Sequence, residues 1–500
     1  MPRVVVRSVG SATPRALPLP ASPSSRPGDA GALSPASRTP TSPAMSVRCA
    51  PVEAAAHARD VQCRAGPETS AAGSLALGID FGTSGCRVSV IDGESQQIVY
   101  EGAGKYVGEQ DDPTASWRQA MVTLVTSVPE EVRARVGSVA IDGTSGTTIL
   151  VDIDTGDVLA EPKMYFEAQP AEAVAAVRAV APENHTTRSS SSALCKLLTW
   201  YTSGLIAELE RAGKRPVLMH QADWAAWLLH GQWCSDWNNA LKLGLEPDTG
   251  TFPEWMTSKP WAKYLPPVAH APGTVVAPVT ATAAVLLGVP ADCKVCAGTT
   301  DSIAAFLAAG VTEPGQAVTS LGSSIAIKLL SEVRVDDVER GVYSHRLDGS
   351  WLVGGASNAG CTVLRQLFTD EQIAELTPRL DPDTPTGLDY YPLPLEAVGE
   401  RFPVGAPDRR CKVEPRPDDD AVFLQGILEA LTSVEASAYA VLAEMGATPV
   451  KEVLTAGGGA KNPKWQAMRE AAIGVPVRAA EQGQASYGAA LLALRGAAKS

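Results

Sequence analysis

Two similar segments, one in each half of the chain, constrain the fold more than any other feature of the sequence. Residues 77–92 read LGIDFGTSGCRVSVID, and residues 318–330 read VTSLGSSIAIKLL. Each has a short apolar segment, a turn of glycine with serine or threonine, and a second apolar segment, which is typical of a β-hairpin. The repetition predicts a weak internal duplication, with a related sheet in each half of the chain.

Strand and helix patterns alternate along the rest of the chain. Apolar segments of strand length and segments with helical spacing follow one another from residue 75 onward, which favours an α/β fold. Strands are predicted over residues 75–80, 87–92, 97–100, 137–142, 147–152 and 452–456, and helices over residues 113–128, 302–310 and 422–445.

Glycine turns at the ends of predicted strands favour a phosphate-binding site. The turns are Gly82-Thr83-Ser84-Gly85, Gly322-Ser323-Ser324 and Gly457-Gly458-Gly459. Glycine removes the Cβ that would keep a phosphate away, and backbone N–H groups and short hydroxyl side chains donate to its oxygens. One such turn also occurs in ordinary hairpins, whereas three of them indicate a nucleotide bound between two lobes. The sequence has neither the GxGxxG nor the GxxxxGK[ST] pattern, so a Rossmann or P-loop site is excluded.

Two aspartates lie at strand ends beside these turns. Asp80 ends the first predicted strand, and Asp301 follows the strand that leads to Thr300. A carboxylate in this position is well placed to hold Mg²⁺ or to accept a proton from a hydroxyl group. The structural alternatives are that Asp301 is the N-cap of helix 302–310 and that Asp80 stabilises its own turn.

Together these segments resemble the FGGY family of carbohydrate kinases, which belongs to the actin/sugar-kinase ATPase superfamily. The resemblance runs from about Leu75 to the C-terminus and is most specific over residues 78–92, 297–324 and 454–468, with residues 223–252 also similar. It implies an α/β fold of two ribonuclease-H-like domains with an interdomain active-site cleft for ATP, Mg²⁺ and a polyol or ketose. The expected divisions are a disordered leader over 1–72, a sugar-binding domain over 73–292 and a nucleotide-binding domain over 293–500.

The resemblance also implies roles for single residues. Asp301 is expected to be the catalytic base that accepts the proton of the attacking sugar hydroxyl. Asp80 is expected to help hold Mg²⁺ and substrate, and both carboxylates are expected near the metal and the sugar. The residues expected to bind ATP are Thr83, Ser84, Gly85, Gly322, Ser323, Ser324, Gly457, Gly458, Gly459 and Asn462.

The sequence departs from the family pattern at two segments that would contact the sugar. Residues 142–152 read DGTSGTTILVD and residues 164–170 read MYFEAQP, where glycerol and xylulose kinases typically carry Gln/His and Trp/Asp/Arg motifs. We expect the hydroxyl of Ser145 to bind the sugar instead. This combination is similar to the compact plant and cyanobacterial branch associated with D-ribulose phosphorylation, so D-ribulose is the expected substrate and D-xylulose the first alternative. A non-catalytic nucleotide-binding regulatory protein and a chaperone-like or actin-like ATPase are alternatives of other classes.

The net charge and the hydropathy of the chain argue against two classes of binding partner, nucleic acids and membranes. The net charge of −13 argues against nucleic acid, because binding to phosphate backbones needs a basic face. No uninterrupted apolar run reaches the ~20 residues that cross a bilayer, so no membrane partner is expected. We predict that the protein is a monomer or a homodimer. Cys293 and Cys296 form the only CxxC among nine cysteines and are expected to be buried thiols.

The first 72 residues differ in composition from the remainder. They contain eight Arg, no Lys and four acidic residues among many Ser and Pro. An Arg-rich and Ser-rich segment without an apolar centre is typical of an organelle transit peptide. Because proline disfavours a long amphipathic helix, we expect import into the plastid (chloroplast) stroma more than into the mitochondrion, with processing near residues 47–50. The alternative is an ordinary disordered tail.

Overall fold

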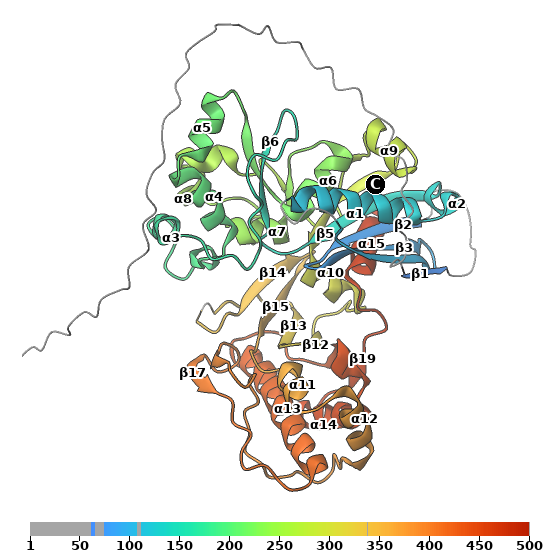
Figure 1. The fold of residues 1–500 in the computed structure, drawn as a ribbon, viewed down its shortest axis with the longest axis vertical. Helices are drawn as coiled ribbons and strands as arrows, with labels where there is room; N and C mark the ends of the chain where they lie inside the picture. Colours follow the sequence, from blue (N-terminus) through green and yellow to red (C-terminus); the bar gives the residue numbers. More distant parts are fainter. Residues whose placement is uncertain (1–61, 66–74, 108–111, 338, 500) are drawn as a thin grey trace, which may run out of the picture. The chain divides into compact units, whose positions relative to one another are not determined.

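The computed structural model describes residues 62–65, 75–107, 112–337 and 339–499. The described residues form one compact unit, in which two large sheets are the main elements (Figure 1). The helices outside the sheets are α1 (Pro113–Ser127), α2 (Glu130–Arg133), α3 (Ala171–Arg178), α4 (Ala193–Thr202), α5 (Leu205–Arg211), α6 (Gln221–His230), α7 (Trp237–Leu243), α8 (Glu254–Thr257), α9 (Ala281–Leu287), α10 (Asp301–Ala308), α11 (Cys361–Leu367), α12 (Asp370–Leu376), α13 (Asp420–Glu444), α14 (Pro463–Ile473) and α15 (Ala485–Lys499).

The first sheet has seven strands, and its centre is parallel. In spatial order they are β1 (Gln62–Ala65), β4 (Ile98–Lys105), β3 (Gly85–Asp92), β2 (Leu75–Phe81), β5 (Val136–Gly143), β11 (Lys294–Thr300) and β10 (Val275–Pro278). Strand β5 is parallel to both β2 and β11, and the other pairs are antiparallel. The carboxyl ends of β2, β5 and β11 therefore meet at one edge of the sheet.

The second sheet repeats this arrangement. Its order is β14 (Tyr343–Leu347), β15 (Ser350–Ala356), β13 (Ile325–Ser331), β12 (Gln316–Leu321), β18 (Glu452–Ala456) and β19 (Val477–Ala479). Strands β15, β13 and β12 form an antiparallel ribbon, and β18 and β19 continue it in parallel. The same order of connections occurs in β4, β3, β2, β5 and β11, so the predicted duplication is confirmed. Three two-stranded sheets complete the fold: β6 (Thr148–Asp152) with β7 (Pro216–His220), β8 (Ser235–Asp236) with β9 (Ala269–His270), and β16 (Val398–Glu400) with β17 (Ala406–Arg410).

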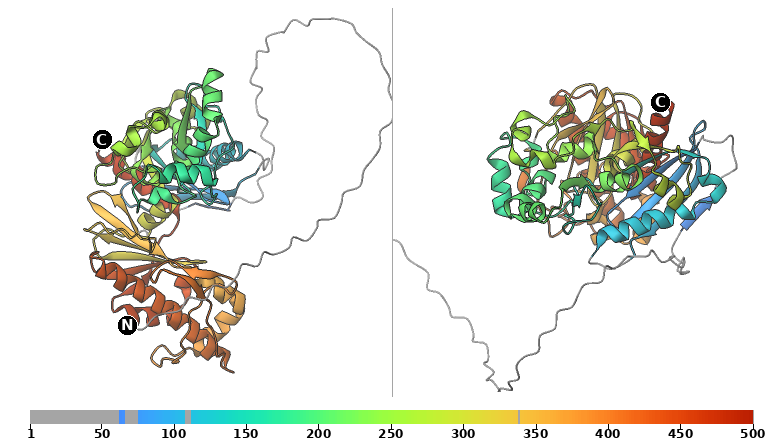
Figure 2. Two further views of the ribbon diagram at one scale, coloured as in Figure 1. Left: turned by 90° about the vertical axis from the view of Figure 1, so that its left-hand side faces the viewer. Right: turned by 90° about the horizontal axis from the view of Figure 1, so that it is seen from above.

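Helices bury both faces of β2, which explains why all seven of its residues are buried. Alternate side chains from Leu75 to Phe81 pack with α1, which lies along the first sheet (Figures 1 and 2). The opposite face packs against α15, the last helix of the chain. A Cβ on Gly78 would lie 1.9 Å from the carbonyl oxygen of Ser486, and one on Gly488 would lie 1.8 Å from that of Ala304. Glycine at both positions lets α15 pack closely against β2 and α10.

The sheets do not follow the predicted domain boundary between residues 292 and 293. Strand β11 starts at Lys294 but belongs to the first sheet, and α15 returns to the same sheet. Strand β11 and helix α15 belong to the first sheet through contacts between residues far apart in the chain. A single boundary in the sequence therefore cannot separate the two sheets.

One strand lies inside the predicted leader. Gln62–Ala65 form β1 and pair with Tyr100–Ala103 of β4, whereas residues 1–61 and 66–72 lie outside the described residues. The prediction that residues 1–72 are disordered throughout is therefore wrong at β1. An edge strand needs mainly backbone hydrogen bonds, so the side-chain pattern gave no signal for it.

Helix α13 is one candidate for a membrane span by length and composition alone. Its 25 residues include a window with mean hydropathy 1.2, and 56% of that window is buried in the fold. Phe423, Leu424, Ile427 and Leu431 of this helix pack in the core of the second sheet. Glu435, near its middle, forms an ion pair with Arg469. These contacts identify α13 as a core helix.

Candidate functional site

The parallel strands of the first sheet bring three aspartates to one edge. Asp80 on β2 stands opposite Asp142 on β5, and Asp142 stands opposite Thr299 on β11, two residues before Asp301. Of these three, Asp80 and Asp301 were predicted site residues and Asp142 was not. A signal for it exists, because residues 141–146 read IDGTSG and residues 79–85 read IDFGTSG.

A cavity of about 410 Å³ opens at this edge. It is lined by residues of the first hairpin turn, the start of α10 and the segment leading into α15: Asp80, Gly82, Thr83, Ser84, Arg87, Asp301, Ser302, Ala305, Gly483, Gln484 and Ala485. Four predicted site residues, Asp80, Thr83, Ser84 and Asp301, thus share one cavity. The residues of turns 322–324 and 457–459 are not among those that line it.

Asp80 is buried and only partly satisfied. Its carboxylate Oδ2 accepts a hydrogen bond from Nη1 of Arg87 at 2.9 Å, and its residue exposure is 3%. Its Oδ1 is buried without a hydrogen-bond partner among the described residues. A buried acceptor without a partner is costly, and a cation or a ligand hydroxyl beside this cavity would remove that cost. The side chain therefore fits a metal or substrate ligand better than a turn stabiliser.

Asp301 has the properties of a base that works near neutral pH. Burial raises its pKa to about 6, and the negative charge of Asp80 adds to this, while the N–H of Ser302 and the charge of Lys328 act in the opposite direction. The Ser302 N–H donates to Oδ1 of Asp301 at 2.7 Å. Helix α10 begins at Asp301 itself and its N-cap is Thr300, so Asp301 is not the N-cap of this helix.

Asp142 is the most deeply buried of the three carboxyl groups. Both of its side-chain oxygens lack hydrogen-bond partners among the described residues, and its exposure is 0%. Burial raises its pKa well above the ordinary range, with the charge of Asp80 adding to the effect. Burial and the neighbouring charge of Asp80 therefore both favour the neutral form of Asp142.

The glycines of the first turn are fixed by close approach. A Cβ on Gly82 would lie 3.0 Å from Nη1 of Arg87, the group that binds Asp80. A Cβ on Gly85, at the start of β3, would lie 2.5 Å from the carbonyl oxygen of Gly104. Tyr106 donates its hydroxyl to the carbonyl of Gly82 at 2.8 Å. The turn is thus held rigidly beside Asp80 and has room for a phosphate where side chains are missing.

The other two glycine turns meet at the edge of the second sheet. Strands β12 and β18 are parallel neighbours with Ser320 opposite Ala456, so the turns that follow them are adjacent. Gly457 has a φ of 88°, and a Cβ there would lie 2.6 Å from the carbonyl oxygen of Leu321. The structure therefore brings turns 322–324 and 457–459 together, as a nucleotide cradle requires.

Asn462, which is expected to lie beside the adenosine, makes hydrogen bonds that stabilise the start of helix α14. Its Oδ1 accepts from the N–H groups of Lys464 and Trp465 at 3.0 Å each, which makes it the N-cap of α14. Its Nδ2 donates to the hydroxyl of Thr377 at 3.2 Å. The role of Asn462 in nucleotide binding stays a prediction.

Ser145 lies in the turn after β5, at the same sheet edge as Asp142. Its Oγ is buried and has no hydrogen-bond partner among the described residues. It is not among the residues that line the cavity beside Asp80. The unpartnered hydroxyl is consistent with the expected contact to a sugar, and that contact stays a prediction.

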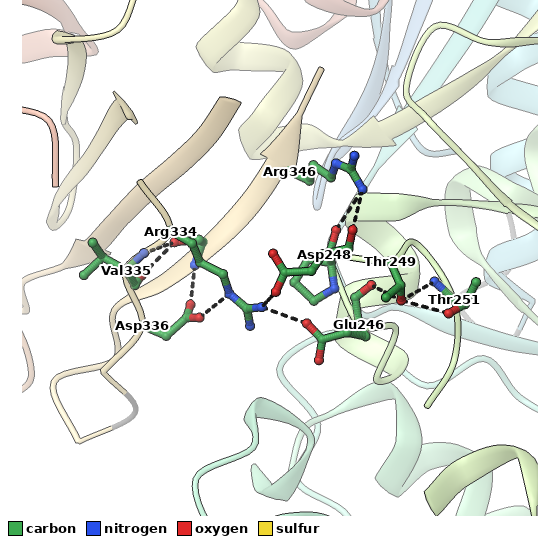
Figure 3. A network of polar contacts seen from close by, with 10 residues as sticks. Glu246, Asp248, Thr249, Thr251, Arg334, Val335, Asp336 and Arg346 are labelled. Atoms are coloured by element: carbon green, nitrogen blue, oxygen red, sulfur yellow. Dashed lines mark hydrogen bonds and ion pairs between the residues drawn. The ribbon is translucent and has the colours of Figure 1, made fainter. Parts of the chain in front are cut away.

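A polar network joins the segment after α7 to the second sheet (Figure 3). Nη1 of Arg334 forms an ion pair with Glu246 at 2.7 Å and another with Asp248, and its Nε pairs with Asp336 at 2.6 Å. Arg346 donates to the carbonyl of Asp248 at 3.0 Å. These contacts link the segment after α7 to the loop that follows β13 and to Arg346 of β14.

Part of the chain matches a known family model. The model is described as the C-terminal domain of the FGGY family of carbohydrate kinases, and it matches residues 317–497. These residues are thus similar to that domain, as the sequence led us to expect, and they contain turns 322–324 and 457–459.

Solved structures of sugar kinases have the same fold. A xylulose kinase from Rhodospirillum rubrum aligns with a TM-score of 0.69 and 22% identity, over 85% of this chain and 90% of that one. Plasmodium falciparum glycerol kinase with ADP aligns with a TM-score of 0.70 and 16% identity, over 84% and 88%. At these identities the likeness shows the fold alone, and it confirms the predicted two-sheet α/β architecture of the sugar-kinase and actin-like ATPases.

A curated relative is similar over part of its length. Autoinducer-2 kinase from Yersinia enterocolitica is 27% identical over 330 residues, which are 57% of this chain and 59% of the relative. Because less than two thirds of that protein is matched, its activity and substrate come to this chain only as a proposal.

Proposed function

We propose that this protein is an ATP-dependent carbohydrate kinase that phosphorylates a ketopentose, with D-ribulose converted to D-ribulose 5-phosphate as the first choice and D-xylulose as the alternative. One observation carries the proposal. A carboxylate whose pKa lies near 6, Asp301, shares a cavity with Asp80 and with the hydroxyl turn of Thr83 and Ser84. This is the set of groups that phosphoryl transfer to an alcohol requires.

In this proposal Asp301 accepts the proton of the sugar hydroxyl as that oxygen attacks the γ-phosphate. Its raised pKa matches the task, because a base near neutrality is both ionised and able to hold the proton. The rigid turn with Thr83 and Ser84 would face the phosphates, and turns 322–324 and 457–459 would bind the remainder of ATP. Positioning of the two reactants then supplies much of the rate.

A divalent ion, with Mg²⁺ as the expected one, fits the residues present. Asp80 offers a buried oxygen without a partner, and Asp301 offers a second carboxylate on the same cavity. Carboxylate oxygens together with phosphate oxygens and water are the ligands that Mg²⁺ prefers. Among the described residues no group of three or more His, Cys, Asp or Glu side chains could hold a metal, so the phosphates would have to complete the coordination. When bound, the ion would neutralise charge on the phosphates.

A coupled assay of ADP release tests the function. The full chain is mixed with Mg-ATP and, in separate reactions, with D-ribulose, D-xylulose, L-ribulose, glycerol or no sugar. Strong stimulation by D-ribulose would support both the reaction and the substrate, and preferential stimulation by D-xylulose would replace the substrate but keep the reaction. ATP binding without stimulation by any sugar would favour a non-catalytic nucleotide-binding protein. The Asp301→Asn variant in each reaction reports contaminating activity.

We also propose that the protein is imported into the plastid stroma, on the strength of the Arg-rich and acid-poor composition of residues 1–72. A fluorescent protein fused after residue 72 tests this. Import into plastids supports the proposal, whereas mitochondrial or diffuse fluorescence contradicts it.

A further inference from the structure

A lysine is buried beneath the segments that depart from the family pattern. Lys196 on α4 has 0% exposure, and its Nζ donates to the carbonyl of Gly146 at 2.7 Å and to that of Met164 at 2.6 Å. Among the described residues no carboxylate lies within ion-pairing distance of this Nζ. Burial of an ammonium group without a counter-charge is costly, so the fold must gain something from its two carbonyl contacts.

Those two carbonyls belong to the two candidate sugar segments. Gly146 follows Ser145 in the turn after β5, and Met164 begins the sequence MYFEAQP. The segments are also tied directly, because the N–H of Tyr165 donates to Oγ1 of Thr147 at 3.1 Å. Lys196 therefore completes a junction between two stretches that are 18 residues apart in the chain.

Two hydroxyls at this junction are buried without hydrogen-bond partners among the described residues, Oγ of Ser145 in the turn and Oγ1 of Thr148 at the start of β6. The N–H and Oγ1 of Thr144 donate to Oε1 of Gln221 at 3.0 and 2.7 Å, and Thr144 also bonds Thr147 at 2.6 Å. The carbonyl of Gly146 is held by Lys196. Between these anchors Oγ of Ser145 is buried without a partner. A turn fixed on both sides around one unsatisfied donor is built to present that donor to a ligand.

The second segment carries exposed aromatic rings. Tyr165 and Phe166 pack edge to face with centroids 5.1 Å apart, and 63% of Phe166 is exposed. Exposed rings suit a sugar, which has apolar C–H faces as well as hydroxyl groups, and the contact of the Tyr165 N–H with Thr147 ties this segment to the turn that contains Ser145.

We propose that Lys196 is a positioning residue of the sugar site, whose ammonium group holds the turn around Ser145 and the segment of Tyr165 and Phe166 in the arrangement that receives the ketose. The proposal rests on the kinase function proposed above and assigns its substrate contacts to this junction. Burial lowers the pKa of Lys196 to about 8, with Glu167 raising it and Lys163 lowering it, so the ammonium form predominates at pH 7. It then has enough donors for both carbonyls.

The test compares Lys196→Met and Lys196→Gln with the wild-type full chain. Lys196→Met keeps an unbranched apolar chain and removes every donor, and Lys196→Gln keeps an amide with two donors. We expect Lys196→Met to raise KM for the stimulating sugar by about tenfold or more while KM for ATP changes less than about twofold, and we expect Lys196→Gln to recover part of this loss. Ser145→Ala should add little in the Lys196→Met background, because the hydroxyl is already misplaced.

Arg469→Met is the matched control, since it also removes a buried cation that donates to neighbouring groups, on helix α14 beside the second sheet. It should lower thermal stability without a selective rise in KM for the sugar. Equal rises in KM for sugar and ATP in both Lys196 variants, or a fall in stability with unchanged KM for the sugar, would overturn the positioning role. If Lys196→Met does not fold, Lys196→Gln decides alone by the same criterion. A wild type that no sugar stimulates would remove the proposed function and the sugar site with it.

Discussion

The two large sheets bury charge in opposite ways. Arg469 and Glu435, beside the second sheet, are each 1% exposed, and their side chains form two hydrogen bonds of 2.6 and 2.7 Å with each other. Thr319 and Thr455 satisfy further atoms of this pair. In the first sheet, three oxygens of Asp80 and Asp142 are buried without partners among the described residues.

The difference distinguishes buried charged groups that stabilise the fold from buried charged groups that are available to a ligand. A buried ion pair with all of its hydrogen bonds made specifies the packing around it, and breaking it destabilises the fold. Buried carboxyl groups whose oxygens lack partners among the described residues carry a desolvation cost, and their retention beside a cavity indicates use in binding or catalysis. Each prediction below changes one side of this comparison.

The largest effect is expected at the base. Asp301→Asn should lower kcat by about 10²–10⁴-fold, because the amide cannot accept the proton of the sugar hydroxyl. Binding of ATP should persist, since turns 322–324 and 457–459 are untouched. Steady-state kinetics with the stimulating sugar checks this, with Asp418→Asn as an exposed control. Turnover within tenfold of the wild type would remove Asp301 from its assigned role.

A large effect on stability, with no direct effect on chemistry, is expected in the second sheet. Arg469→Met should lower the free energy of unfolding by about 3–5 kcal/mol, because it leaves Glu435 buried without its counter-charge. The double variant with Glu435→Gln should recover part of the loss. Urea unfolding measures both. A stable Arg469→Met variant with greatly reduced turnover would contradict the separation between the two sheets.

A smaller effect is expected from pH. Burial raises the pKa of Asp301 to about 6, so kcat/KM should fall about tenfold for each pH unit below that value. Arg469 and Glu435 take no part in proton transfer. The protein should stay folded at pH 5, so unfolding should not account for the fall in kcat/KM. Rates measured between pH 5 and 8 after confirming folding by circular dichroism check this. A flat profile across that range would show that Asp301 does not have to be ionised.

The strand ends and helices that depend on the local pattern of residues could be predicted from the sequence. The strand ends at Asp80 and Asp301 were predicted because an apolar segment followed by a glycine turn marks where a strand stops. That both lie in the first sheet was not predicted, because the expected boundary put Asp301 in the second domain, whereas β2 and β11 both pair with β5. Helix α13 was predicted from its apolar spacing and is observed over Asp420–Glu444, close to the expected 422–445.

The sequence did not suffice where long-range contacts decide. The return of α15 to the first sheet depends on the absence of a Cβ at Gly78 and Gly488, which has meaning only once the two elements touch. Lys196 lies in an ordinary helical pattern, and nothing local distinguishes it from an exposed lysine. Asn462 does have a local signal for its observed contacts, because Asn before Pro463 is a common helix start and the structure uses it as the N-cap of α14.

A further effect on stability is expected at Asp142. Its pKa is raised well above the ordinary range in the folded protein, so folding takes up a proton once the pH exceeds the unfolded value of about 4. The stability given by the protonated form is complete below that pH and is lost as the pH rises toward the folded pKa. Asn at this position resembles the protonated acid and does not titrate. The melting temperature of Asp142→Asn relative to the wild type should therefore increase from pH 4 to pH 8, and a constant or decreasing difference would show that Asp142 is ionised in the folded protein.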